Sequence, residues 1–147
     1  MSDAIVVGTD GSDTAKQAVD EAVRLAKALG AEIHLVSAFH ALRGARITGA
    51  PEGAAKVWAP LPDSIVDSTL EQAETHVRLA GVPVVKHALE RDPAVALLEV
   101  ADEVGASMIV VGSRGMHGAK RVLGSVPNTV SHRANCNVLI VATGGEE

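Results

Sequence analysis

Aromatic residues are nearly absent from this sequence: its 147 residues include one Phe, one Trp and no Tyr. The core must therefore be aliphatic, built from Val, Leu, Ile and Ala. A surface that stacks the bases of single-stranded nucleic acid on aromatic rings is excluded. The net charge of −5 offers no basic field for duplex DNA or for an anionic membrane. We therefore expect no nucleic acid and no membrane among the partners.

Cysteine and long apolar runs are also lacking. The single cysteine, Cys136, excludes an intrachain disulfide and a thiolate cage for a metal. No apolar run approaches the ~18–20 residues of a membrane span, and residues 1–5 contain no basic segment followed by an apolar one. The six histidines show no metal-ligand spacing. These absences predict a cytoplasmic protein without a metal site.

What the sequence does contain favours a folded domain. Hydrophobic residues make up 47% and charged residues 21%, which excludes a disordered chain. A chain of this length is near the usual size of one domain and suffices to bury a core. We expect a single domain over residues 1–147 that ends in a polar tail at 144–147.

Apolar runs rich in β-branched residues alternate with segments of helical periodicity. The predicted strands are 4–8, 32–38, 82–89, 107–111 and 137–142. The predicted helices between them are 15–29, 66–80, 93–104 and 125–134. Asp92 followed by Pro93 is a typical helix start. This alternation predicts an α/β fold: an open parallel sheet with right-handed crossovers and helices on both faces.

Residues 39–62 interrupt the alternation. They contain several glycines and prolines and show no steady hydrophobic period. A connection of roughly two dozen residues is long against the usual about 4–6. Long surface loops often serve function, but a tolerated insertion explains this segment equally well.

A glycine-rich segment, 112–125, follows the fourth predicted strand. Parallel sheets bind ligands outside the carboxyl ends of their strands, and glycines allow positive φ and a close approach of ligand to backbone. Arg114 adds a positive charge, and Ser125 adds a hydroxyl at a helix N-terminus, where an anion is favoured. These features predict a phosphate site. The alternative is a loop that turns with glycines and caps its helix with Ser125.

Two acidic residues follow the first predicted strand. One of them, or Ser12 between them, could cap the first helix, and for Asp13 we favour this capping role. Asp10 lies at the carboxyl end of the strand, where a buried carboxylate could accept hydrogen bonds from ribose hydroxyls, so a ligand contact is favoured there. The sequence has neither Gly-x-Gly-x-x-Gly nor Gly-x-x-x-x-Gly-Lys-Ser/Thr, so the common dinucleotide and triphosphate loops are not predicted.

The glycine segment nevertheless carries a recognisable pattern. Gly112-x-x-Gly115, then a spacer, then Gly124-Ser125-Val126 and residues 131–141, closely resembles the universal stress protein family. The likeness covers essentially the whole chain apart from 39–62, and it includes residues 9–12, 92–94 and 110–115.

The resemblance implies a Rossmann-like sheet of five strands in the order 3-2-1-4-5, similar to the adenine nucleotide alpha hydrolase-like fold. Some members of the family bind ATP or a related adenine nucleotide, with or without Mg²⁺, and others lack the site. In binding members an acidic residue after the first strand approaches the nucleoside, the end of the second strand lines the adenine pocket, and the glycine loop wraps ribose and phosphates. The matching positions here are Thr9, Asp10, Ala38, Val111, Gly112, Arg114, Gly115, Gly124, Ser125 and Val126.

Two departures from the family pattern affect phosphate contacts more than nucleoside contacts. The spacer 116–123 has eight residues where nucleotide binders have nine, and Pro127 lacks an amide in the first turn of the last helix. We keep nucleotide binding as the expectation, with ATP favoured.

Many family members dimerise by pairing the last strand, which implies a homodimer through 137–142. The leading hypothesis is therefore a dimeric stress-response regulator that binds adenine nucleotide as a switch. One alternative is a nucleotide-free dimeric interaction module of the same fold. Another is a weak ATPase, but the sequence has no Gly-x-Ser-x-Gly elbow and no evident general base. We predict no catalytic residues and at most slow ATP hydrolysis.

Overall fold

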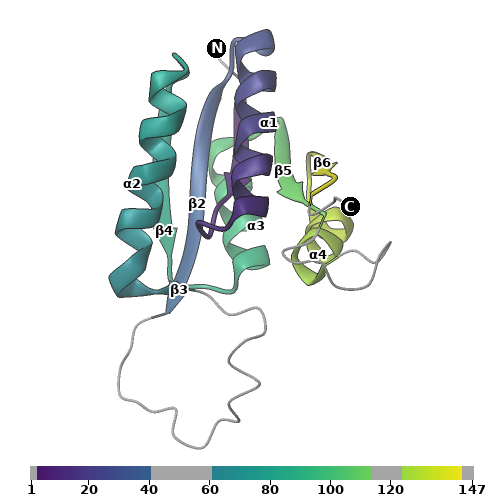
Figure 1. The fold of residues 1–147 in the computed structure, drawn as a ribbon. Coiled ribbons are helices and arrows are strands. Elements are labelled where there is room, and N and C mark those ends of the chain that lie inside the picture. The colour runs from purple at the N-terminus through teal and green to yellow at the C-terminus, as the bar shows by residue number, and fades with distance from the viewer. Residues whose placement is uncertain (1–2, 41–60, 114–123, 144–147) are drawn as a thin grey trace, which may run out of the picture.

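A computed structural model describes residues 3–40, 61–113 and 124–143 (Figure 1). Strands and helices alternate along the chain, as the periodicity predicts. Their bounds are β1 (Ala4–Gly8), α1 (Asp13–Leu29), β2 (Glu32–His40), β3 (Leu61–Pro62), α2 (Asp63–Leu79), β4 (Val84–Leu89), α3 (Pro93–Val104), β5 (Met108–Gly112), α4 (Ser125–Arg133) and β6 (Asn137–Val141).

The five long strands lie side by side in the order β4-β2-β1-β5-β6, and each neighbouring pair is parallel. This confirms the predicted strand order 3-2-1-4-5, because β3 is a short addition that pairs with the end of β2. The chain moves from β1 to β2 in one direction and returns across β1 to reach β5. The carboxyl ends of β1 and β5 therefore flank the point where the strand order reverses, the usual ligand site of such sheets.

The strand β2 is longer than predicted. Phe39 and His40 continue it and pair in register with Leu61 and Pro62, so the predicted loop 39–62 begins and ends in sheet. The reason is packing, because Phe39 contacts the buried cluster that faces α1 and α2. The prediction ended the strand at residue 38 because residues 39–62 as a whole show no steady hydrophobic period.

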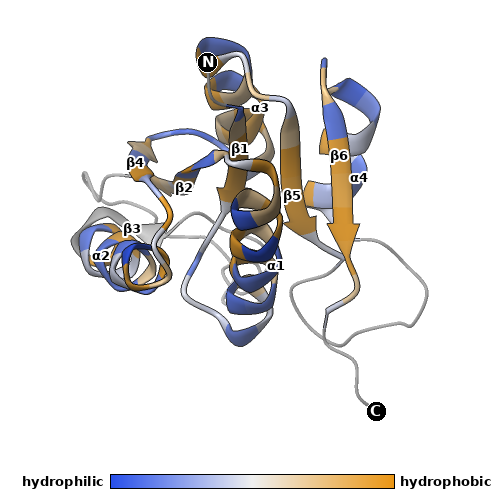
Figure 2. Cartoon of the chain, turned by 90° about the horizontal axis from the view of Figure 1, so that it is seen from above, coloured by the Kyte–Doolittle hydropathy of each residue, from blue (hydrophilic) through white to orange (hydrophobic). Residues whose placement is uncertain are grey.

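Helices cover both faces of the sheet, α1 and α2 on one and α3 and α4 on the other (Figure 2). In the described part of the chain one buried cluster lies under α1 and α2, and a second lies under α3 and α4. Their largest fully buried side chains include Ile5, Ile33, Leu35 and Ile109. The core is aliphatic, as the shortage of aromatic residues requires.

The helix ends follow from capping chemistry. Asp92 caps α3 by accepting a hydrogen bond from the Ala94 amide at 3.2 Å, as predicted. The cap of α1 is Ser12, which accepts from the Ala15 amide at 3.1 Å. Of the possible caps, Ser12 is therefore the right one and the preference for Asp13 was wrong, because Asp13 lies in the first helical turn and Ser12 has the extended backbone that a cap requires.

Candidate functional site

The turn after β1 forms one wall of the carboxyl edge. Thr9 is buried, its amide donates to the Val36 carbonyl at 2.9 Å, and its hydroxyl accepts from the Gly11 amide at 3.3 Å. Gly11 has φ +84°, a left-handed conformation that favours glycine. One hydrogen bond therefore holds the turn to β2, and a second one, within the turn, holds Gly11 to Thr9.

Asp10 stands at the tip of this turn with its side chain exposed. Its Oδ1 accepts a hydrogen bond from the Ser12 amide at 2.9 Å, which corrects the expectation of a buried carboxylate. The local Asx turn explains the difference, since Asp side chains readily bond the backbone two residues on. An ionised carboxylate has further lone pairs, so Asp10 can still accept a hydrogen bond from a ligand hydroxyl.

Ala38 lies near the end of β2, paired in register with Leu89 of β4. Its side chain is half-buried against the cluster under α3 and α4. A methyl group at this place makes a small apolar wall beside the Thr9 turn, suited to a flat apolar face rather than to a hydrogen bond.

The end of β5 is joined closely to the start of α4. The Gly124 amide donates to the Ser113 carbonyl at 2.9 Å. Gly112 has no positive φ, and it is a close-approach glycine: a Cβ built there would meet Cγ2 and Oγ1 of Thr143 at 3.1 Å. The Thr143 amide in turn donates to Ser113 Oγ at 3.1 Å.

Val111, by contrast, is buried in the core under α3 and α4. Its side chain does not reach the carboxyl edge, so any contact it makes with a ligand there involves its backbone.

The N-terminus of α4 is open. Gly124 occupies the cap position and makes no side-chain hydrogen bond to the helix, while Ser125 and Val126 are the first helical residues. The alternative in which Ser125 caps this helix is therefore wrong. In the part of the chain that the structure describes, the amides of Ser125 and Val126 have no backbone acceptor. Pro127 follows in the same turn and has no N–H to donate.

An open helix N-terminus attracts an anion, because unpaired amides and the helix dipole both favour negative charge. The exposed Ser125 hydroxyl adds a third donor. This arrangement can hold one phosphate group without any positively charged side chain.

The fold thus brings most of the predicted site residues to one edge of the sheet. Thr9 and Asp10 directly follow β1, Ala38 lies in β2, Gly112 ends β5, and Gly124–Val126 form the cap and the first two residues of α4. Arg114, Gly115 and the spacer 116–123 lie outside the described residues.

Ser113 and Thr143 at this edge were not predicted from the sequence. Ser113 directly follows β5, and Thr143 lies two residues after β6. A polar residue just past the end of a strand is the sequence signal that could have identified both.

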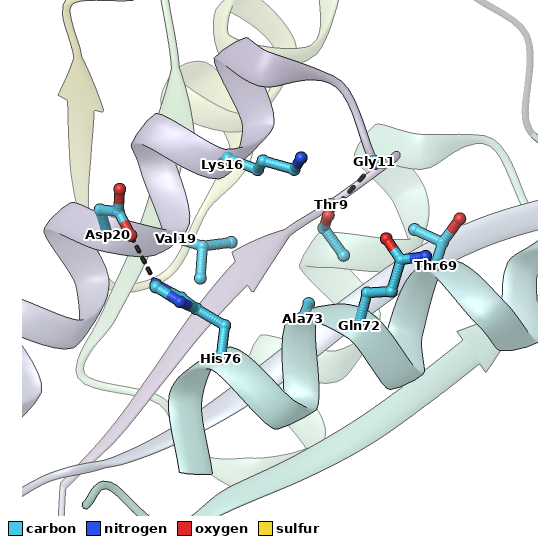
Figure 3. Close-up of a pocket in the computed structure, with 9 residues that line it drawn as sticks. All are labelled: Thr9, Gly11, Lys16, Val19, Asp20, Thr69, Gln72, Ala73 and His76. Carbon is cyan, nitrogen blue, oxygen red and sulfur yellow. Dashed lines mark hydrogen bonds and ion pairs between the residues drawn. The ribbon is translucent and has the colours of Figure 1, made fainter. Parts of the chain in front are cut away.

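A cavity of about 320 Å³ adjoins the Thr9 turn, between α1 and α2 (Figure 3). It is lined by Thr9, Gly11, Lys16, Val19, Asp20, Thr69, Gln72, Ala73 and His76. Among residues 3–40, 61–113 and 124–143 no group of three or more His, Cys, Asp or Glu side chains is placed to hold a metal. The helices within those ranges are all too short or too polar to cross a membrane.

Comparison with known proteins places this geometry in a family. The model of the universal stress protein family matches residues 1–142. Universal stress protein Rv1636 of Mycobacterium tuberculosis is 38% identical over 145 residues, covering 95% of both chains. A solved universal stress protein in complex with cAMP is 32% identical with a TM-score of 0.74, covering 97% of this chain and 98% of its own.

A universal stress protein from Archaeoglobus fulgidus in complex with dAMP is 29% identical with a TM-score of 0.64, covering 94% of this chain and 96% of its own. These matches extend over nearly the whole length of each protein. The chain belongs to the universal stress protein family.

Proposed function

We propose that this protein binds an adenine nucleotide at the carboxyl edge of its sheet, with a phosphate group at the N-terminus of α4. The observation that carries the proposal is the open start of this helix, whose first amides have no acceptor among the described residues and lie beside the end of β5. The complexes of similar universal stress proteins with cAMP and dAMP support adenine as the base.

We assign the nucleoside part of the ligand to the carboxyl ends of β1 and β2, which lie across the point of strand-order reversal from β5 and α4. Ala38 offers an apolar contact to the adenine ring, and the Asp10 carboxylate accepts hydrogen bonds from the ribose. No aromatic side chain is needed for this, since aliphatic walls and backbone groups supply the contacts.

The hydrogen-bond donors described at the N-terminus of α4 suffice to bind one phosphate group. ATP, the nucleotide favoured by the sequence, needs further contacts for its β- and γ-phosphates. Arg114 and Gly115 are the candidates for these contacts and lie outside the described residues. We propose ATP as a ligand on the strength of the family motif, with Mg²⁺ supplied by the nucleotide.

We further propose a cytoplasmic homodimer that acts as a regulatory switch in a stress response. β6 stands at the edge of the sheet and carries Val138, Leu139, Ile140 and Val141, each of them half-buried. An apolar edge strand with a free row of backbone groups favours pairing with a second copy.

The test is calorimetric titration of the nucleotide-stripped protein with ATP, with and without Mg²⁺, and with AMP and cAMP in parallel. Saturable binding of ATP near one per chain is expected. A clear preference for AMP or cAMP would restrict the proposal to a single phosphate. The absence of heat with every nucleotide, on folded protein, would favour the nucleotide-free interaction module instead.

The variant Gly124→Val separates the site from the fold. The branched side chain stands at the cap of α4, beside the amides that receive the phosphate, so nucleotide affinity should fall by at least about tenfold. Ser131→Val places the same side chain on the exposed part of the same helix and should leave the affinity unchanged. Equal affinities of the two variants would contradict the assignment of the phosphate to α4.

A further inference from the structure

The cavity between α1 and α2 contains polar groups that the nucleotide site does not use. Lys16 comes from α1 and extends toward the Thr9 turn, whereas Thr69 and Gln72 come from α2 and line the same cavity from the other helix (Figure 3). In the described part of the chain, none of these three side chains makes a hydrogen bond or an ion pair. Lys16 and Gln72 are exposed and Thr69 is buried, so an ammonium, an amide and a hydroxyl line one cavity without a partner among the described residues.

Thr69 is the most buried of these three residues. Only 8% of it is exposed, and its hydroxyl still lacks a partner within the described protein. The hydroxyl oxygen itself is open to the cavity, where water or a ligand can satisfy it. Its neighbourhood in this structure is the cavity.

A second unpaired hydroxyl lies nearby in the sheet. Ser37 of β2 is 1% exposed, and its Oγ has no hydrogen-bond partner. The register that pairs Gly8 with Val36 places Ser37 beside Thr9, on the face covered by α1 and α2. Ser37 does not line the cavity itself, but it adds a buried hydroxyl to the sheet next to Thr9, which does line it.

The acidic side chain that lines the cavity is already engaged. Asp20 Oδ1 lies 2.6 Å from His76 Nε2, and this pair joins α1 to α2 at the opposite end of the cavity from Gly11 and Thr69 (Figure 3). The positive charge of Lys16 is therefore the unpaired charge of the lining. Val19 and Ala73 supply an apolar surface between the two ends.

We propose that this cavity is a binding site for a small organic oxyanion, separate from the nucleotide site. The charged oxygens accept hydrogen bonds from Lys16, Gln72 and Thr69, and the carbon skeleton lies on Val19 and Ala73. A carboxylate and a phosphate ester share this chemistry. The cavity volume of about 320 Å³ falls at the small end of ligand pockets and suits a metabolite rather than a nucleotide.

The test follows backbone amide shifts of the whole protein by NMR during titration with succinate, glycerol phosphate and inorganic phosphate. Saturable shifts of Lys16, Gln72 and Gly11 are expected with at least one of these probes. The probe that saturates distinguishes a carboxylate from a phosphate ligand. If no probe gives saturable shifts on folded protein, the proposal is overturned.

The matched variants are Lys16→Gln and Lys27→Gln. Both remove one positive charge from α1, but Lys27 lies exposed in its last turn and away from the cavity. Loss of a charged hydrogen bond should weaken the probe by at least about tenfold in Lys16→Gln and leave it unchanged in Lys27→Gln. Equal weakening in both would mean that the probe senses overall charge, which overturns the site.

Two further variants distinguish loss of this site from a folding defect and from binding at the nucleotide site. Thr69→Val preserves the shape of the side chain while it removes the hydroxyl, and it should weaken the probe severalfold. Gly124→Val should leave probe binding intact. Loss of probe binding in Gly124→Val would place the anion at α4 and overturn a separate site, whereas failure of nucleotide binding alone would leave this proposal standing.

Discussion

At the scale of single residues, Gly112 shows why the edge of the sheet needs a glycine. Its backbone is not left-handed, so conformational freedom does not explain it. The reason is Thr143, whose Cγ2 and Oγ1 would both lie 3.1 Å from an added Cβ. Contacts this short force one of the neighbours to move, and Thr143 is held by the bond from its amide to Ser113 Oγ.

We therefore expect Gly112→Ala to lower the free energy of unfolding by about 1–3 kcal/mol, the usual cost of overpacking. Thr143→Ala removes both atoms that the new methyl would meet. The double variant should then be more stable than the sum of the two single effects by about 1 kcal/mol. Urea denaturation of the four proteins measures this coupling, and strictly additive effects would show that the close contact is not the cause.

The turn after β1 shows the limit of residue-level prediction. Ser12 and Asp13 are both good capping residues, and the sequence does not say which of them occupies the N-cap position of α1. The structure places Ser12 outside because its backbone is extended and Ala15 stands three residues on. Asp10 was correctly placed at the carboxyl end of β1, but its exposure follows from a local hydrogen bond to Ser12 that no periodicity reveals.

At the scale of elements, the pairing of β2 with β4 creates a histidine pair that the sequence separates by 53 residues. His34 Nδ1 lies 2.8 Å from His87 Nε2, and His34 Nε2 lies 2.8 Å from Glu32 Oε2. The rings are stacked with centroids 5.1 Å apart. The carboxylate accepts from His34 Nε2, so a neutral His34 must accept from His87 through Nδ1.

Burial lowers the pKa of His87 below its ordinary value of 6.5, and the nearby His34 lowers it further, while Glu103 of α3 opposes the shift. The unfolded chain then binds a proton more readily than the folded one, so stability is retained above pH 6.5 and declines as the pH falls below it.

The variant His87→Gln should flatten this decline. The measurement is the urea midpoint at pH 7.5 and pH 5, where wild type should lose more stability on acidification than the variant. The exposed His132→Gln serves as control and should behave as wild type. A fall in stability as steep in His87→Gln as in wild type would contradict the role of this residue.

Element boundaries were predictable where a single residue marks them. Gly30 and Gly105 end their helices in the left-handed conformation, and Asp92-Pro93 begins α3. The end of β2 at His40 was not predictable, because the last two residues of this strand pair with Leu61 and Pro62, which are distant in the sequence. Sheet pairing between distant segments leaves no local pattern in the chain.

At the scale of the whole molecule, alternating strands and helices suffice to predict a parallel sheet with two helical layers. They do not determine the strand order, since several orders satisfy right-handed crossovers. The order came from the family motif, which links Gly112 and Gly124 to a particular sheet. The cavity between α1 and α2 had no such motif, because Lys16 and Gln72 meet through helix packing alone.

The two edges of the sheet differ in a way that bears on assembly. β4 at one edge carries one charged residue, the exposed Lys86, whose ammonium lies 3.2 Å from Glu74. Charges at an edge discourage pairing with another chain. β6 at the other edge carries four successive apolar residues and no charge. Among the described residues, the edge at β4 thus carries a charge and the edge at β6 carries none.

A charge placed on β6 should accordingly break a homodimer, whereas the same charge on β4 should not. Leu139→Lys introduces an ammonium into the proposed interface, and Val85→Lys introduces one at the opposite edge, where the side chain is already 42% exposed. We expect wild type and Val85→Lys to sediment as dimers at micromolar concentration and Leu139→Lys as a monomer with unchanged circular dichroism. A monomeric wild type, or a dimer that only Val85→Lys disrupts, would refute pairing through β6, because the row of backbone groups at that edge would then be left to water.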